Sequence, residues 1–129
     1  MDAYKLPDAI ILCGGLGTRL NSIQPDLPKI LTPVGKGALI DVLIGQIIRA
    51  GLKRVVLSLG HLSETVVRYV DTIDKSNIEI INVTESKPLG TGGALKLACS
   101  KSQSEYFLVI NGDSYTDICL LYTSDAAAE

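Results

Sequence analysis

Aromatic and histidine side chains are scarce in this chain of 129 residues. It has no tryptophan, one phenylalanine, five tyrosines and one histidine. So few rings argue against a platform on which single-stranded nucleic acid stacks. Lysine and arginine number 12 against 14 aspartates and glutamates, and the formal net charge of −2 excludes a strongly basic, nucleic-acid-coating protein. We therefore expect no nucleic-acid partner.

Paired cysteines and long apolar runs are also missing from the sequence. Cys13, Cys99 and Cys119 are far apart and form no Cys-x-x-Cys pair. With a single histidine, this spacing argues against a structural zinc site, and the odd number is typical of reduced thiols in a cytosolic protein. No apolar run approaches the ~18 residues of a membrane span, and no signal peptide is visible. These absences predict a cytoplasmic protein without a membrane partner.

What the chain does have is a regular alternation of apolar runs. Hydrophobic residues make up 47% of it, enough to bury a core. Four short runs are typical of strands buried in a parallel sheet, at residues 8–13, 54–59, 78–83 and 106–110. Three segments are expected to be helical, at residues 38–50, 63–73 and 94–99, with Ser63 as the cap of the second. The alternation predicts an α/β fold with a Rossmann-like, doubly wound, mainly parallel sheet.

Two segments stand outside this alternation. Residues 21–37 contain three prolines and two glycines, so we expect a loop with at most a short extended piece at residues 30–32. Residues 119–129 (CLLYTSDAAAE) resemble a translated transposase-type sequencing-library adapter, with Ala128 where the usual run has aspartate. We expect a non-native tail there, a genuine C-terminus being the alternative. The native part of the domain is then residues 1–118.

A glycine-rich sequence, GGLGTRL at residues 14–20, follows directly on the first predicted strand. Glycines there let the backbone approach a ligand and direct consecutive N–H groups at phosphate oxygens. The loop lacks the Lys-Ser/Thr of a P-loop, and Leu20 stands where a dinucleotide fingerprint needs glycine. It does carry Arg19, and Lys29 places a second cation after Pro28, ten residues further on. Two cations at one mouth of a sheet predict a ligand rich in phosphate.

Five motifs along the chain form an ordered set. They are GGLGTRL at residues 14–20, PK at 28–29, PV at 33–34, ESKPLGTGGA at 85–94 and NGD at 111–113. In this order they resemble the sugar-phosphate nucleotidyltransferase family, in particular the guanylyltransferases that act on mannose-type or heptose 1-phosphates. Each motif alone is weakly specific, whereas the ordered set is highly specific. The resemblance implies transfer of a nucleotidyl group to a sugar 1-phosphate, with pyrophosphate as the other product and Mg²⁺ as cofactor.

The resemblance also implies roles for individual residues. Arg19 would clamp the triphosphate, and Lys29 would neutralise charge near the α-phosphate and the incoming sugar phosphate. Asp113 would bind Mg²⁺, because a hard carboxylate at the end of a strand suits that ion. The implied nucleotide-binding residues are Leu12, Gly14, Gly15, Gly17, Thr18, Glu85 and Gly90.

Glu85 bears on the choice of nucleobase. A carboxylate only accepts hydrogen bonds, and guanine presents two donors side by side, so the pairing favours GTP. In the family the sugar site and a second metal-binding aspartate come from later sequence, so this chain alone is expected to turn over weakly or not at all. The family also allows a homo-oligomer of the full-length protein.

Two alternatives stay open. The first is a non-catalytic, nucleotide-sensing or regulatory module of the same fold, against which the joint presence of Arg19, Lys29 and Asp113 argues. The second is a dinucleotide-dependent oxidoreductase. It is weaker, because no acidic residue ends the second predicted strand.

Overall fold

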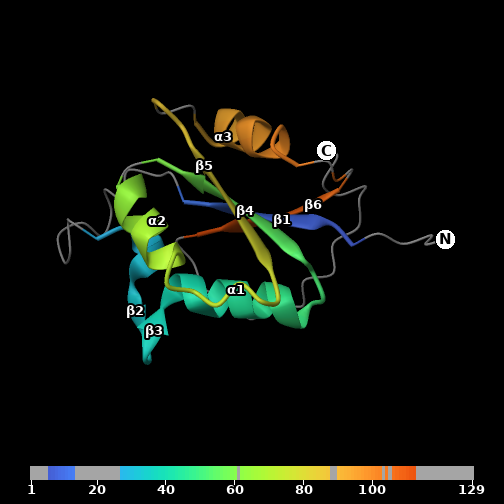
Figure 1. Cartoon of the computed structure of the whole chain (residues 1–129). Helices are drawn as coiled ribbons and strands as arrows, with labels where there is room; N and C mark the ends of the chain where they lie inside the picture. The colour runs from blue at the N-terminus through green and yellow to red at the C-terminus, as the bar shows by residue number, and fades with distance from the viewer. Residues whose placement is uncertain are drawn as a thin grey trace.

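The computed structural model describes residues 6–13, 27–60, 62–87, 90–102, 104 and 106–112. These residues form a parallel sheet with helices on both faces and a short hairpin beside it (Figure 1). The elements in chain order are β1 (Asp8–Leu12), the 3-10 turn η1 (Lys29–Leu31), β2 (Pro33–Val34), β3 (Gly37–Ala38), α1 (Leu39–Arg49), β4 (Arg54–Leu59), α2 (Ser63–Val70), β5 (Glu79–Thr84), α3 (Gly90–Cys99) and β6 (Phe107–Asn111).

The described part of the sheet has four strands in the order β5-β4-β1-β6, and every pair of neighbours is parallel. The chain moves outward from β1 through β4 to β5 and then crosses to the other side of β1 with β6. Leu12 pairs with Ser58 on one side and with Asn111 on the other, so β1 and β6 end on one rung and β4 ends one residue beyond it. We call this edge of the sheet the carboxyl edge. The direction in which successive strands are added changes between β1 and β6, since β4 and β5 lie on one side of β1 and β6 on the other. Open α/β sheets bind their ligands at such a point.

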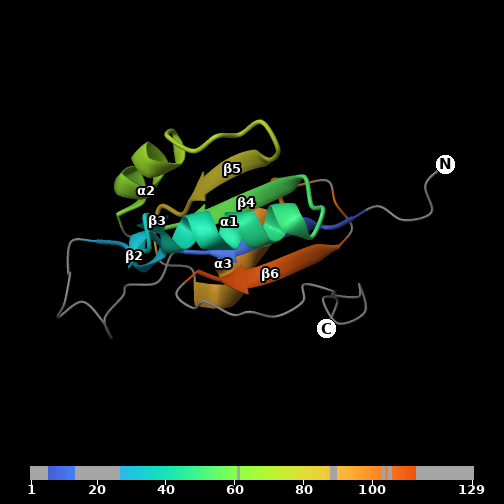
Figure 2. The ribbon, with the colours of Figure 1, turned by 90° about the horizontal axis from the view of Figure 1, so that it is seen from below.

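Helices pack against both faces of the sheet. Because successive side chains of a strand point to opposite sides, one strand contributes to both layers of the core. Ala9 and Ile11 of β1 pack toward α1, whereas Ile10 packs toward Ala98 of α3. Figure 1 shows α1 and α2 on one side of the sheet and α3 on the other, and Figure 2 shows α1 in front of β4 and β1. The inner face of α1 consists of fully or nearly fully buried residues: Leu39, Ile40, Leu43, Ile44 and Ile47. Each such side chain stabilises the fold by roughly 1.5–3 kcal/mol relative to an exposed one.

The doubly wound, parallel α/β fold expected from the sequence is confirmed. The predicted strand 54–59 matches β4 at both ends, and each of the other three strands differs from its prediction by one residue at one or both ends. The predicted helix 38–50 corresponds to α1. The structure departs from the sequence prediction in three places.

The first correction concerns residues 30–32, of which Ile30 and Leu31 are not extended and only Thr32, with φ −54° and ψ 130°, leaves the turn. The Leu31 N–H donates to Pro28 O at 2.9 Å, and this closes a 3-10 turn that buries Ile30 and Leu31. The second concerns a hairpin that was not predicted. The antiparallel pair β2 and β3 follows this turn, and Gly35 takes a left-handed φ of 59° in its short loop.

The third correction concerns the helix ends. Leu62 precedes α2 in a left-handed conformation, and the Ser63 N–H donates to Gly60 O, so Ser63 is the first helical residue and not the cap. The helix also ends at Val70, short of the predicted residue 73. Helix α3 begins at Gly90, four residues before the predicted start, because burial of Ala94 and packing of Ala98 against the sheet outweigh the low helix propensity of glycine.

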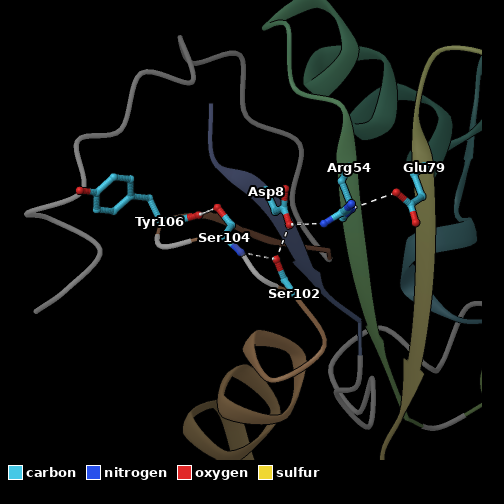
Figure 3. A network of polar contacts seen from close by, with 6 residues as sticks. All are labelled: Asp8, Arg54, Glu79, Ser102, Ser104 and Tyr106. Carbon is cyan, nitrogen blue, oxygen red and sulfur yellow. Dashed lines mark hydrogen bonds and ion pairs between the residues drawn. The ribbon is translucent and has the colours of Figure 1, made fainter. Parts of the chain in front are cut away.

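Polar side chains link the strands at the opposite edge, where they begin (Figure 3). Arg54 lies between Asp8 and Glu79, with Nη1 3.4 Å from Asp8 Oδ2 and Nε 3.0 Å from Glu79 Oε1. Ser102 Oγ donates to the same Asp8 oxygen and accepts from the Ser104 N–H at 3.1 Å. This network, which we call the amino-edge network, joins β1, β4, β5 and the connection from α3 to β6. No helix in the described part of the chain is long and apolar enough to cross a bilayer.

Candidate functional site

The carboxyl edge is tightly closed between β1 and β6. The Gly112 N–H donates to Leu12 O at 2.9 Å, and on the other side of β1 the Cys13 N–H donates to Ser58 O at 2.8 Å. A Cβ atom on Gly112 would lie 2.9 Å from Leu12 O and 3.1 Å from Ile30 Cδ1. Only glycine therefore fits at 112 without a shift of its neighbours, and the turn η1 lies directly against the end of β6.

Lys29 is the first residue of that turn, and the turn fixes its backbone. The Thr32 N–H and hydroxyl both donate to Lys29 O, at 3.0 and 2.7 Å. The next residue, Ile30, is buried and packs beside Gly112. The structure thus brings the turn of Lys29 to the end of β1, next to the residue that precedes Asp113 in the sequence.

Glu85 lies at the far end of the same edge. Its N–H donates to Leu59 O at 2.9 Å and so extends the pairing of β5 with β4. The side chain is partly buried, and its Oε2 atom is buried without a hydrogen-bond partner among the residues that the structure describes. A buried acceptor without a donor costs about 1–3 kcal/mol, so the atom fits a ligand that brings a donor. The strand β4 separates β1 from β5, which places Glu85 about 10 Å along the edge from the β1–β6 junction.

Cys13 directly follows β1 and precedes the glycine-rich sequence. Burial raises the pKa of its thiol from 9.0 to about 12, and the thiol lies 3.5 Å from Ile11 O. The thiol therefore stays protonated and neutral at ordinary pH. It is neither a ready nucleophile nor a negative charge that would repel phosphate.

Gly90, the last predicted nucleotide-binding residue in the chain, begins α3. Its φ of 75° is left-handed, and no heavy atom would lie within 4 Å of an added Cβ. Backbone conformation, and not lack of space, therefore makes glycine the fitting residue at this position.

The described residues include Leu12, Lys29, Glu85 and Gly90 of the predicted site. The other predicted site residues lie outside the described part of the chain, namely Gly14, Gly15, Gly17, Thr18, Arg19 and Asp113. The segment 119–129 also lies outside it. The described residues contain no cluster of three or more His, Cys, Asp or Glu that could hold a metal ion. The roles of all these residues stay predictions.

The model of the family described as nucleotidyl transferase matches residues 8–128, which is nearly the whole chain. The chain belongs to the nucleotidyl transferase family.

Relatives of this nucleotidyl transferase agree with that assignment. The D-glycero-alpha-D-manno-heptose 1-phosphate guanylyltransferase of Campylobacter jejuni is 38% identical over 87% of the chain and 50% of the relative. The protein of the same name from Aneurinibacillus thermoaerophilus is 37% identical over 83% of the chain and 46% of the relative. The crystal structure of HddC from Yersinia pseudotuberculosis complexed with GMP-PN superposes with a TM-score of 0.80 at 35% identity, over 88% of this chain and 51% of that one. The chain thus spans about half the length of the curated relatives it matches.

Sequence reasoning missed one residue that shapes the site of this nucleotidyl transferase. The sequence identifies Gly112 only as part of the NGD motif, whereas in the structure it packs closely between Leu12 and Ile30. A glycine between the end of a strand and an acidic residue was the available signal. Which neighbours it would touch depends on the strand order, and the sequence alone does not state that order.

Proposed function

We propose that this chain is the nucleotide-binding part of a sugar-1-phosphate guanylyltransferase. The reaction transfers GMP from GTP to a mannose-type or heptose 1-phosphate and yields a GDP-sugar and pyrophosphate. The observation that carries the proposal is the buried Oε2 of Glu85, which has no hydrogen-bond partner in the described part of the chain and lies on the same edge as the turn of Lys29 and the β1–β6 junction. This arrangement offers an acceptor for a base at one end and a cation for phosphates at the other.

The recognition of guanine follows from the chemistry of Glu85. The carboxylate accepts from the N1–H and the exocyclic amine of guanine together, and each bond satisfies one of its oxygens. Uracil or thymine would place a carbonyl oxygen opposite one carboxylate oxygen, and that pair repels. The similarity to two guanylyltransferases and to a structure complexed with GMP-PN supports the same choice of base.

The proposed reaction needs alignment and charge neutralisation more than covalent help from the protein. A phosphate oxygen of the sugar 1-phosphate attacks the α-phosphorus of GTP, a new P–O bond forms, and the bond to the β-phosphate oxygen breaks as pyrophosphate leaves with the electron pair. Lys29, fixed on its turn at the β1–β6 junction, would offset negative charge between the two reacting phosphates. Arg19 would do the same for the leaving pyrophosphate.

The residue types of this chain fit a magnesium ion in part. Asp113, which follows Gly112 in the sequence, would supply one hard carboxylate oxygen, and the Gly112 N–H is bonded to the end of β1. When bound, Mg²⁺ would reduce the repulsion between phosphate oxygens. Within this chain we assign it to Asp113 alone.

The test is the nucleotide preference of the chain, measured by calorimetry with GTP and UTP. We expect the unmodified chain to prefer GTP. The variant Glu85→Gln replaces one acceptor by a donor and should weaken GTP binding about tenfold or more. UTP binding should stay the same or become tighter, because the amide N–H2 donates to the uracil carbonyl that the carboxylate repels. Glu79→Gln, an exposed glutamate at the other end of the same strand, is the matched control and should change neither value.

An unaltered preference in Glu85→Gln would refute the assignment of the base. Pyrophosphate release with GTP and sugar 1-phosphates, measured on the full-length gene product, separates the enzyme from a nucleotide sensor. Binding of GTP without release for any sugar phosphate would favour the sensor.

A further inference from the structure

A carboxylate away from the predicted site joins three elements next to the turn of Lys29. Asp41, in the first turn of α1, accepts the Ala38 N–H at 2.9 Å through Oδ2. The same oxygen accepts the hydroxyl of Tyr69, which comes from α2. We call Asp41, Ala38 and Tyr69 the helix clamp. The pKa of Tyr69 is raised, mainly by the hydrogen bond to Asp41 and to a lesser extent by partial burial. The phenol therefore stays protonated and continues to donate.

Gly37 keeps room for the clamp. A Cβ atom there would lie 2.6 Å from Asp41 Oδ2, so any other residue would push the carboxylate away from its two donors. The position of Asp41 therefore depends on a glycine in β3, a backbone N–H before α1 and a side chain of α2. A carboxylate in the first turn of a helix is also favoured by the helix dipole.

A short path of hydrogen bonds leads from the clamp to Lys29. Ala38 pairs with Pro33 across the hairpin, and the Leu39 N–H donates to Thr32 O at 2.8 Å. Thr32 in turn donates to Lys29 O from both its N–H and its hydroxyl. The turn itself has only three residues, and 3-10 geometry is weak when it stands alone. Contacts outside the turn must therefore hold it in place.

We propose that Asp41 and Tyr69 are positioning residues for Lys29, which hold its turn at the β1–β6 junction for binding of the triphosphate. The inference rests on the proposed function, because it gives Lys29 a phosphate to neutralise. It assigns a role to a contact between α1 and α2 that lies outside the set of predicted site residues. The competing explanation is that the clamp only stabilises the start of α1.

A double-mutant cycle distinguishes the two explanations. The probe is GTP, and the dissociation constant is measured by calorimetry for the unmodified chain, Tyr69→Phe, Lys29→Met and the double variant. Tyr69→Phe should weaken GTP binding by about threefold to tenfold. In the Lys29→Met background the same change should have an effect of less than about twofold, because the residue through which Tyr69 acts is gone. A merely structural role would give equal losses in both backgrounds.

Two further variants control for folding. Asp41→Asn keeps a carbonyl oxygen for both donors and should retain GTP binding to within about twofold, whereas Asp41→Ala should behave like Tyr69→Phe. Tyr106→Phe alters a tyrosine that is 44% exposed and directly precedes β6, and it should leave GTP binding unchanged. Melting temperatures of all variants show whether each remains folded at the temperature of the titration.

The outcomes separate this inference from the proposed function. If Lys29→Met weakens binding while Tyr69→Phe does not, or if the two losses are additive, the positioning role is overturned and the proposed function stands. If Lys29→Met leaves GTP binding unchanged, the role of Lys29 fails and the positioning role fails with it. Absence of GTP binding by the unmodified chain would overturn both.

Discussion

Replacement of Gly112 by alanine tests the closest approach at the carboxyl edge. The added methyl group would lie 2.9 Å from Leu12 O, 3.1 Å from Ile30 Cδ1 and 3.2 Å from Ile11 Cγ2. Carbon atoms in contact prefer about 3.5–4.0 Å, so all three neighbours are too near. Leu12 O is a backbone atom that accepts the Gly112 N–H, so it cannot withdraw without loss of that bond.

The expected cost follows from two opposing effects. Overpacking of a close contact destabilises by about 1–3 kcal/mol, and the stiffer unfolded chain of alanine returns about 0.4–1 kcal/mol. We expect a net loss of about 1–2 kcal/mol in the free energy of unfolding, measured by urea titration. In a chain of this size the melting temperature should fall by roughly 4 °C for each kcal/mol.

Two further variants serve as controls for Gly112→Ala. Gly92→Ala adds the same methyl group in open space inside α3 and should stabilise by about 0.5–1 kcal/mol. Ile30→Val removes the Cδ1 atom, so in combination with Gly112→Ala it should relieve the second contact and leave the contact with Leu12 O. If Gly112→Ala is as stable as the unmodified chain while Gly92→Ala behaves as expected, the close approach of β6 to β1 and η1 is wrong.

Further predictions concern pH and the amino-edge network. The folded Cys13 thiol has a pKa of about 12, so above pH 9 only the unfolded thiol ionises and stability falls. The stability difference between the unmodified chain and Cys13→Ala should shrink by about 1 kcal/mol from pH 8 to pH 10 in urea titrations; an unchanged difference would show that the folded thiol ionises too. Asp8→Ala loses the ion pair to Arg54 and the bond from Ser102 and should cost about 2 kcal/mol in denaturation. Glu79→Ala, which removes the exposed partner of the same arginine, should cost less than about 1 kcal/mol, and equal costs would contradict this account.

Elements with a strong hydrophobic period could be predicted from the sequence. The apolar spacing in residues 38–50 identifies α1, and the run at residues 54–59 identifies β4. The turn at Lys29 could not be predicted, because residues after Pro28 can continue extended or turn, and burial of Ile30 decides between them. The early start of α3 has a similar cause, since glycines favour a loop until a sheet is there to pack against.

The candidate site, too, could be predicted from the sequence only in part. Motif reasoning selected Leu12, Lys29 and Glu85, and the structure places all three along the carboxyl edge. The spatial relation among them depends on the order β5-β4-β1-β6, which local patterns do not encode. The contact of Gly112 with the turn of Lys29 and the link from Tyr69 to Asp41 both join segments that are distant in the sequence, and only the folded chain reveals them.

The amino-edge network has a consequence for how such a protein can change over time. The ionic contacts among Asp8, Arg54 and Glu79 lie at the edge of the sheet opposite the proposed nucleotide site. Residues at the carboxyl edge can therefore change during evolution, and with them the preferred base or sugar, while the amino-edge network that aligns the strands stays the same. A fold that separates its stabilising ion pairs from its proposed binding residues can change its specificity without loss of stability.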